Sequence, residues 1–380
     1  AHCSDGLVEW CNLVSPTMPV LPDDMIVQIL VRLSVKSLLQ FKSVCKSWRT
    51  LISSPQFAMD NFLQRSSADR RLPSRLIYEN NDYYNYQFRF LPLQPLFMNP
   101  SATTSVVSFE IGYYMGLLVI RGSCNGLLCL HHVRSDSICL WNPCTRSESQ
   151  WFPIDTSSLS YFGFGYDHVH DKYKFVMVDE QVLTRIFTFG ANSCSFGPNF
   201  PYPAVGFSRF IGKFLSGTGT LNWMAKVNDK NWVILSLDLA NETFRQVSLP
   251  TLYGGDNSCD PELQILRNCL SFSIDHRDII FDVWMMKEYG VWESWTLISR
   301  VNLRRHSNSY PLTPLSISED DVLLLMIPNG RLVLFKADVD LFCYPKIDSS
   351  SDGLLSFPIC SEGVFRTYFV HHDSLVMPPQ

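Results

Sequence analysis

Four cysteines and two histidines lie close together near the middle of the chain. The cysteines are spaced C-x4-C-x9-C-x4-C; the six positions are Cys124, Cys129, Cys139 and Cys144, with His131 and His132 between them. Zinc binds thiolate and imidazole, but structural zinc sites usually take two cysteines from one tight turn. Cys124 and Cys129 are five positions apart, so along one strand they would face opposite sides. The spacing favours cysteines packed on strands, and we expect no metal.

Other short motifs give no stronger sign of chemistry. His168-Val169-His170-Asp171 could present two imidazoles and a carboxylate together, but it precedes a strand-like run and is typical of a solvated hairpin tip. The glycines at 163 and 165 lack the third glycine of a dinucleotide site, and those at 217 and 219 lack a P-loop lysine. There is no G-x-S-x-G elbow. We therefore expect no catalytic residues, no cofactor and no enzyme activity, unless histidines and acids distant in sequence meet in space.

Composition limits the class of protein. The 380 residues suffice for two domains, and 46% hydrophobic with 13% aromatic residues can fill a large core. A net charge of −5 does not suggest a nucleic-acid binder. No run of 18 apolar residues could span a membrane, and no secretory signal accompanies the 12 cysteines. We expect reduced thiols and a cytoplasmic or nuclear location, or both.

Residues 21–52 read as three short amphipathic helices. Asp23 and Asp24 supply helix-start chemistry, and apolar residues then recur at helical spacing from Met25 to Leu33. Ser34 and Ser43 are candidate caps for a second and a third helix. So small a unit cannot bury its own apolar surface, so the surplus predicts either a partner site or packing on the rest of the chain.

From about residue 72 the pattern changes to short β-like runs separated by turn residues. Strand-end anchors recur at spacings of 48, 49, 48 and 50 residues, and stepping back 48 from the first lands on Leu93; these anchors are Trp141, Phe189, Asp238, Met286 and Lys336. A second series is Leu127, Leu221, Leu270 and Leu323. A period near 48 with three or four strands per unit is typical of a β-propeller. We predict a degenerate propeller of about six blades, with an irregular pair of β-sandwiches as the alternative.

The predicted fold class is therefore multidomain, α plus all-β. Residues 1–17 lack periodicity and are expected to be a disordered leader, with the helical domain at 18–64. Arginines gather at Arg65, Arg70, Arg71 and Arg75, which predicts a solvated basic linker over 65–75. The propeller is expected to occupy residues 76–380.

The helical stretch resembles an F-box, the segment through which substrate receptors bind the Skp1 adaptor of cullin–RING ubiquitin ligases. The matching residues are Leu21-Pro22-Asp23, Ile29-Leu30, Leu33, Val35-Lys36-Ser37-Leu38, Phe41-Lys42, Val44-Cys45-Lys46, Trp48-Arg49 and Leu51-Ile52-Ser53. Ser34 departs from the proline that plant members usually carry, but either residue can begin a helix.

The β-rich region resembles the F-box-associated domain of a large plant family often labelled F-box/kelch-repeat. The motifs are Gly122-Ser123-Cys124-Asn125-Gly126-Leu127-Leu128, Leu140-Trp141-Asn142-Pro143, Gly163-Phe164-Gly165-Tyr166-Asp167, Gly219-Thr220-Leu221-Asn222-Trp223 and Trp284-Met285-Met286-Lys287-Glu288-Tyr289-Gly290. The S-locus F-box proteins of pollen carry similar motifs, so membership of that branch stays open.

The resemblance implies a non-catalytic substrate receptor of an SCF (Skp1–cullin–F-box) ubiquitin ligase. The Skp1-like adaptor would link it to cullin and RING subunits, and the propeller would bind an unknown target protein; no nucleic acid or membrane is expected as a partner. The residues expected to bind Skp1 are Leu21, Pro22, Ile29, Leu30, Leu33, Leu38, Leu39, Val44 and Trp48. Aromatic residues expected in exposed loops, and so in the substrate surface, are Tyr161, Phe162, Tyr202, Phe207, Phe210, Tyr253, Trp292 and Tyr310.

Two other functions are compatible with the sequence. The propeller could bind a small molecule or glycan, or catalyse a reaction at its central channel, with the F-box as its means of regulation. The protein could also act with Skp1 outside a ligase.

Overall fold

The structure of the protein is a computed structural model. It describes residues 21–66, 74–82, 85–110, 118–157, 159–191, 193–203, 210–228, 231–250, 260–277, 279–303, 312–327, 331–348 and 368–380. The chain divides into two compact units, residues 1–70 and residues 71–380. The expected leader at 1–17 lies outside the described residues.

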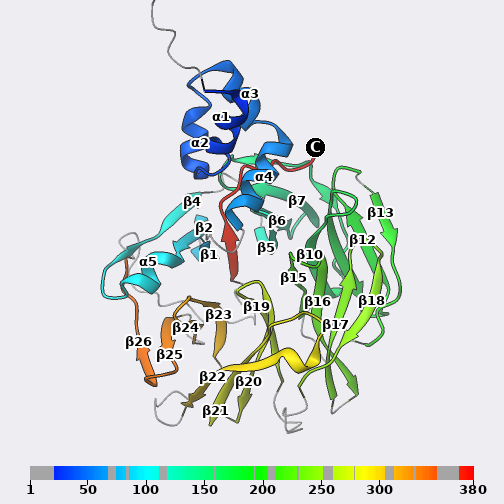
Figure 1. Cartoon of the computed structure of the whole chain (residues 1–380). Coiled ribbons are helices and arrows are strands. Elements are labelled where there is room, and N and C mark those ends of the chain that lie inside the picture. The colour runs from blue at the N-terminus through cyan, green and yellow to red at the C-terminus, as the bar shows by residue number, and fades with distance from the viewer. Residues whose placement is uncertain are drawn as a thin grey trace, which may run out of the picture. The chain divides into compact units, whose positions relative to one another are not determined.

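Four helices make up the described part of the first unit (Figure 1). They are α1 (Asp23–Leu30), α2 (Val35–Phe41), α3 (Lys46–Ile52) and α4 (Pro55–Ser66). The hydroxyl of Ser34 accepts from the backbone N–H of Ser37 and caps α2 as predicted, whereas α3 is capped by Cys45 and not by Ser43. None of the helices among the described residues is both long and apolar enough to cross a membrane.

Helices α1 to α3 confirm the three helices predicted over residues 21–52, and α4 is a further helix that was not predicted. Arg65 belongs to α4, and Arg75 lies in a β-strand, where its guanidinium pairs with Asp373 at 2.9 Å. Arg70 and Arg71 lie outside the described residues. The two ends of the expected linker therefore belong to regular elements, and residues 67–73 between them lie outside the described residues.

The second unit contains six sheets of four or five strands in the part of the chain that the structure describes (Figure 1). The first blade has the order β28-β1-β2-β4 (Phe369–His372, Ser74–Asp82, Asn85–Pro92, Val107–Glu110). The second is β5-β6-β7-β8 (Leu118–Cys124, Leu127–His132, Ser137–Asn142, Ser147–Glu148), with β9 (Phe152–Pro153) also pairing with β7. The third is β14-β10-β11-β12-β13 (Phe210–Ile211, Leu159–Asp167, Lys172–Asp179, Thr184–Thr188, Ser193–Phe196).

The remaining three blades have four strands each. The fourth is β15-β16-β17-β18 (Lys213–Leu215, Thr220–Asn228, Asn231–Asp238, Thr243–Val247). The fifth is β19-β20-β21-β22 (Glu262–Leu266, Cys269–His276, Ile280–Met286, Trp295–Asn302), with the 3-10 helix η1 (Trp292–Ser294) before its last strand. The sixth is β23-β24-β25-β26 (Thr313–Ile317, Val322–Met326, Leu332–Lys336, Leu341–Cys343). Helix α5 (Leu93–Met98) and the parallel pair β3 (Thr104–Ser105) and β27 (Ile347–Asp348) lie outside these sheets.

The prediction of a six-bladed propeller is confirmed, and the alternative of two sandwiches is wrong. Every predicted anchor falls at the end of the third strand of its blade or directly after it: Trp141 in β7, Phe189 after β12, Asp238 in β17, Met286 in β21, Lys336 in β25 and Leu93 after β2. The second series falls at the start of the second strand of its blade, as Leu127 does in β6. Each repeat in the sequence therefore corresponds to one blade of the ring.

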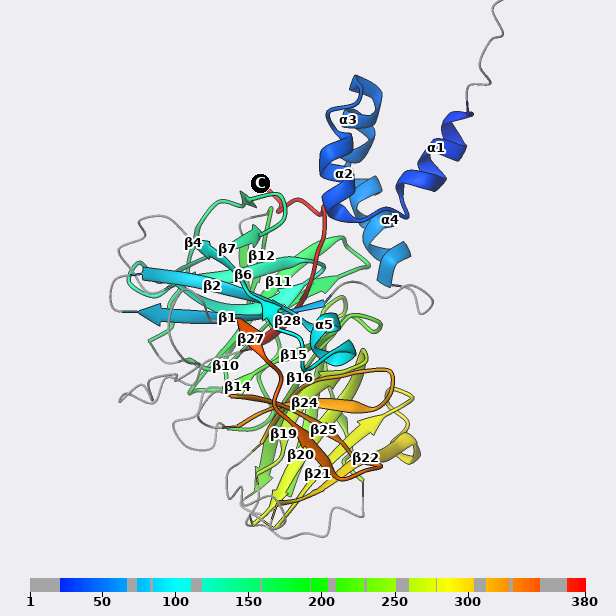
Figure 2. The same ribbon diagram turned by 90° about the vertical axis from the view of Figure 1, so that its left-hand side faces the viewer.

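The ring closes through the first blade, whose innermost strand comes from the end of the chain. The innermost strands β28, β5, β10, β15, β19 and β23 contact one another in succession, and β23 contacts β28 in turn. Strand β28 pairs antiparallel with β1, so that His372 lies opposite Ser74 and Phe369 opposite Ile77 (Figure 2). Both ends of the propeller thus meet in one sheet.

The segment after β28 is held on the second blade by Asn142, at the end of β7. Its side chain is fully buried, and Nδ2 donates to the carbonyl oxygens of Ser374 (3.0 Å) and Val376 (2.7 Å). Oδ1 accepts from the backbone N–H groups of Cys144 (2.7 Å) and Thr145 (3.3 Å). One amide therefore stabilises the turn after β7 and fixes the C-terminal segment at the same time.

The hairpin turn between β5 and β6 reaches the same segment. Asn125 and Gly126 have φ values of 50° and 76°, as a two-residue turn of this kind requires. A Cβ on Gly126 would collide with Cβ of Ser374 and come within 2.8 Å of the carbonyl oxygen of His372. Glycine is needed here for its backbone conformation and for the close approach of the C-terminal segment.

Replacing Gly126 with alanine should therefore loosen ring closure. Strained backbone and the clash with Ser374 should together cost about 3 kcal/mol of unfolding free energy and lower the Tm by roughly 5–10 °C. Thermal and urea unfolding of G126A would measure this. The matched control is G217A, because a Cβ there would meet only the Asn268 amide nitrogen at 3.6 Å. Equal stability of the two variants would contradict the role given to Gly126.

The substitution N142D tests the buried amide without changing its size. A carboxylate keeps the acceptor for the Cys144 N–H but faces the carbonyls of Ser374 and Val376 with no proton to donate. The loss of two buried bonds should cost at least about 3 kcal/mol. Hydrogen–deuterium exchange at residues 369–376 should accelerate most. The control is N99D, at an exposed position, which should change stability by less than about 0.5 kcal/mol; unchanged exchange in N142D would refute the assignment.

Candidate functional site

Helix α1 carries an apolar stripe on its exposed side. Leu21, Met25 and Ile29 recur every four residues and keep 51%, 52% and 49% of their surface exposed. Met25 and Ile29 lie one helical turn apart, about 40° from each other around the helix, and Leu21 lies just before α1 begins; Leu30 is turned about 100° or more away from both and is 1% exposed. An isolated surface helix normally turns polar residues outward, so this helix has a second apolar face that remains uncovered.

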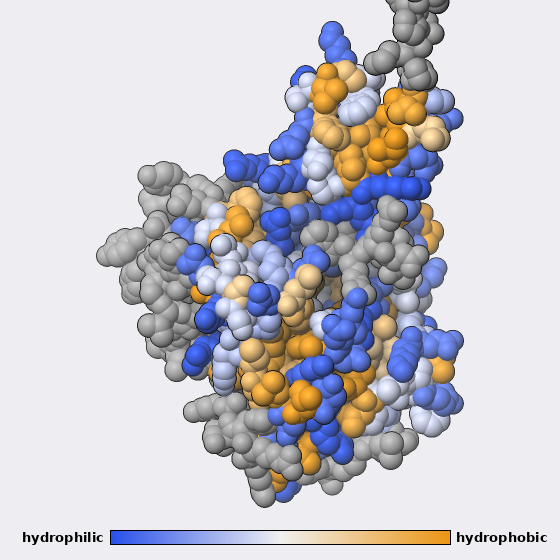
Figure 3. Space-filling model, turned by 60° about the vertical axis from the view of Figure 1, so that its left-hand side comes forward, coloured by the Kyte–Doolittle hydropathy of each residue, from blue (hydrophilic) through white to orange (hydrophobic). Residues whose placement is uncertain are grey.

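The other residues expected to contact an adaptor fall into three groups. Pro22 and Val44 are exposed, and Figure 3 shows apolar side chains gathered on one face of this unit. Leu33, Leu39 and Trp48 are partly buried, with the Trp48 ring 5.6 Å from that of Phe41. Leu30 and Leu38 are fully buried. These two leucines therefore cannot form a contact surface, because their side chains are buried in the core of the helical unit.

Asn61 on α4 is a positioning residue that the sequence reading missed. Its side chain is fully buried, and Nδ2 donates to the carbonyl oxygens of Val31 (2.7 Å) and Leu33 (3.1 Å), just after α1 ends. These carbonyls would otherwise be unsatisfied at the helix terminus. Asn61 thus fixes the end of the helix that presents the apolar stripe. Asn61 lies three and four positions after the buried Ala58 and Phe57, on the same face of α4, but α4 itself was not predicted.

The structure corrects the exposure expected for two of the propeller aromatics. Tyr161 and Phe162 are each 1% exposed and lie in β10, not in a loop. Tyr161 stacks on Phe200 with 4.3 Å between ring centroids, and the guanidinium of Arg121 lies 4.7 Å from the centre of the Phe162 ring. An innermost strand is covered on both faces, so its residues on either side become core.

The remaining aromatic candidates differ in how far the structure describes them. Tyr202 is half-buried and donates its hydroxyl to Gln246 at 3.2 Å. Trp292, in η1, is exposed. Phe210 contributes backbone to β14, but its side chain lies outside the described residues, as do Phe207, Tyr253 and Tyr310 altogether. Among the described side chains of this set, Trp292 is therefore the one exposed enough to contact a partner protein.

An exposed aromatic that was not predicted is Phe196 on the outer strand β13. It is 77% exposed and lines an open groove with Asp179, Glu180, Gln181, Leu183, Arg185 and Cys194. The groove lies on the outer edge of the third blade, because β13 and β12 are the strands farthest from the innermost strand β10. An edge strand offers unpaired backbone groups as well as side chains to an incoming peptide.

Three of the four cysteines lie on strands, as their spacing predicts. Cys124, Cys129 and Cys139 are buried on β5, β6 and β7, and burial raises the pKa of each thiol. His131 lies between Arg121 and Asp136, with both ring nitrogens 2.8 Å from their partners. Residues 168–171 form the exposed turn between β10 and β11. Cys144 differs from the expectation, because it lies partly buried in the turn between β7 and β8 and not on a strand.

Comparisons with known proteins agree with both halves of this description. The family model of the F-box domain matches residues 18–59, and that of the F-box associated beta propeller domain matches residues 116–337. The F-box/kelch-repeat protein At3g23880 of Arabidopsis thaliana is 32% identical over 348 residues, which cover 87% of this chain and 92% of the relative.

Two further relatives from Arabidopsis thaliana extend over much of both chains. The F-box protein CPR1 is 27% identical over 84% of this chain and 82% of its own length. The putative F-box/kelch-repeat protein At1g12870 is 25% identical over 76% and 73%. With an F-box helical unit followed by a propeller of the matching family, the chain belongs to the plant F-box proteins that carry an F-box associated β-propeller domain.

Proposed function

We propose that this protein is the substrate-recognition subunit of an SCF-type ubiquitin ligase. The helical unit binds a Skp1-like adaptor, which connects it to cullin and RING subunits, and the propeller binds a target protein. The observation that supports this most directly is the exposed stripe of Leu21, Met25 and Ile29 on α1. F-box proteins act in general as such receptors, and both family matches support this role.

Burying the stripe would supply only part of the free energy that a stable complex with the adaptor needs. Covering the exposed half of each of the three side chains contributes roughly 1 kcal/mol per residue. A stable complex needs more than this, so the interface also takes in Val44 and the exposed edge of Trp48, which is partly buried against Phe41. Leu30, Leu38 and Asn61 act indirectly, by holding the helices in place.

The contribution to the reaction is proximity. A target held by the propeller is tethered near a ubiquitin-charged E2, so transfer becomes effectively intramolecular. The receptor touches none of the reacting atoms and is non-catalytic. We place this assembly in the cytoplasm, the nucleus or both.

The propeller presents candidate target contacts on its outer parts. Trp292 on the fifth blade and Phe196 on the edge of the third blade are exposed aromatics of the kind that dominate protein interfaces. Such scattered, open surfaces suit a protein ligand better than a small molecule, which needs an enclosed pocket.

The variant I29D tests adaptor binding. A carboxylate at the C-terminal end of the stripe would have to be desolvated on docking, which should weaken binding at least about 100-fold. Ile29 is half exposed, so the helical unit should stay folded. Calorimetric titration of the full chain with a purified Skp1-like adaptor would measure the change, with circular dichroism to check folding.

The control Q56D adds the same carboxylate at an exposed position on α4 and should leave adaptor affinity within about threefold. Affinity purification of the wild type and I29D, followed by mass spectrometry, separates adaptor from target. Skp1 and cullin should disappear from the I29D eluate while target proteins remain. Undiminished adaptor binding by I29D would show that the stripe is not the docking surface.

A further inference from the structure

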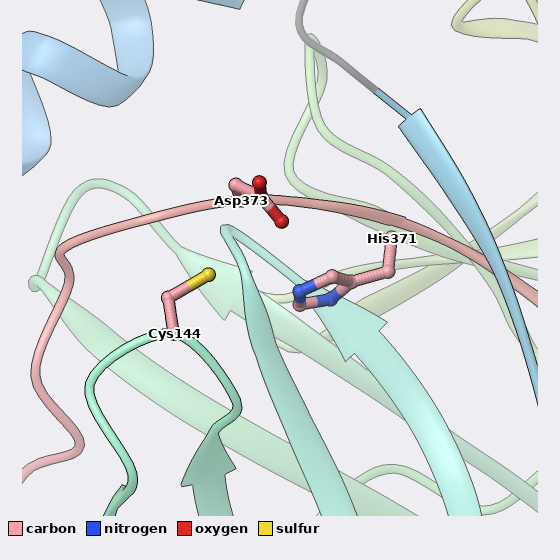
Figure 4. A group of neighbouring side chains, drawn as sticks. All are labelled: Cys144, His371 and Asp373. Atoms are coloured by element: carbon pink, nitrogen blue, oxygen red, sulfur yellow. The ribbon is translucent and has the colours of Figure 1, made fainter. Parts of the chain in front are cut away.

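Three side chains that can ligate metals meet where the ring closes. Cys144 lies in the turn between β7 and β8, His371 in β28, and Asp373 directly after β28. The Sγ atom, an imidazole nitrogen and a carboxylate oxygen all lie within 4.8 Å of one another. Figure 4 shows the three side chains pointing toward one another from the turn and from the C-terminal segment. More than 200 residues separate Cys144 from the other two.

His371 provides independent evidence that something belongs between these groups. Its side chain is fully buried, and Nε2 has no hydrogen-bond partner among the residues that the structure describes. Figure 4 shows one ring nitrogen of His371 facing Cys144. A buried nitrogen without a partner is costly, and such groups are uncommon in native proteins.

The protonation state of His371 suits a metal ligand. Burial, and to a smaller extent the neighbouring His372 and Arg75, lowers the pKa of His371 to about 3, so the imidazole is neutral. Nδ1 lies 3.4 Å from the hydroxyl of Ser123. The tautomer that donates from Nδ1 to Ser123 leaves the Nε2 lone pair directed into the cluster, as in zinc sites whose histidine is oriented by a second hydrogen bond.

The other two residues supply the negative charge that a cation needs. Burial and the neighbouring carboxylate of Asp373 raise the pKa of Cys144 to about 12, so the thiol stays protonated and interacts with Asp373. A divalent cation would displace the thiol proton to solvent and bind the thiolate. Arg75 holds Oδ2 of Asp373 at 2.9 Å and so orients the carboxylate, although its charge opposes the cation.

We propose that Cys144, His371 and Asp373 form a zinc-binding site. One thiolate, one imidazole and one carboxylate match the borderline-soft character of Zn²⁺, whereas Mg²⁺ and Ca²⁺ prefer oxygen ligands only. Water completes a tetrahedral shell, and the three ligands must close by up to about 1 Å to reach zinc bond lengths. The ion would link the second blade to the C-terminal strand, beside the bonds of Asn142, and so reinforce ring closure. The zinc site and the adaptor-binding stripe involve different residues.

Cobalt substitution tests the site in the full-length protein. After metal removal, Co²⁺ should bind with a stoichiometry of one and give the charge-transfer absorption of a cobalt–thiolate bond. C144S should abolish that absorption, whereas C194S should retain it, because Cys194 is exposed and lies outside the cluster. Zinc should raise the Tm of the wild type and of C194S by about 3–5 °C but not that of C144S.

Native mass spectrometry gives a second readout that needs no variant. After metal removal and addition of one equivalent of Zn²⁺, the folded wild type should carry one zinc ion, and C194S should do the same because the exposed Cys194 lies outside the cluster. The proposal fails if Co²⁺ gives the same absorption in C144S, or if the wild type binds no metal stoichiometrically. A folding defect in C144S would not affect the wild-type result.

Discussion

Pairing of β28 with β1 is the contact on which the propeller depends. Each blade buries its faces only against its neighbours, so an open ring would expose the first and last blades. The pairing joins Leu76 to Val370, and closing a loop of about 300 residues costs roughly 5 kcal/mol of chain entropy. The fully buried Leu76 and Ile77 offset part of this cost. The Asn142 amide offsets more, because it bonds two carbonyls of the segment that follows β28.

The same local chemistry ends several strands and makes the repeat visible in the sequence. Asn142, Asp167 and Asp238 each end a strand and accept hydrogen bonds from the backbone N–H groups two and three residues later. Such side chains turn the chain without help from distant contacts. Because strand length and turn are both set locally, the blade period could be predicted from one sequence. The six-bladed fold followed from it.

What could not be predicted depends on contacts between distant residues. The sequence around Tyr161 and Phe162 resembles an aromatic loop, and these two side chains are buried only because β10 lies in the inner ring of strands. Helical periodicity identified the apolar positions of α1 and α2, but not that Leu30 would be buried while Ile29 stays exposed. Sequence spacing grouped Cys144 with Cys139 and Cys129, whereas the fold places it beside His371 and Asp373. Local patterns predict elements, and the neighbours of a side chain follow from topology.

The two units differ in whether they bury their own apolar surface, and this difference suits a receptor with two partners. The propeller satisfies its own surfaces by closing on itself, so it can hold loops and edges in fixed positions whether or not a partner is present. The helical unit is too small to bury all its apolar surface and keeps Leu21, Met25 and Ile29 exposed. Docking would stabilise this unit by mass action, in proportion to the adaptor concentration relative to its Kd. Adaptor binding therefore depends on the apolar surface that the helices leave exposed, while target binding depends on the rigid surface that the closed ring provides.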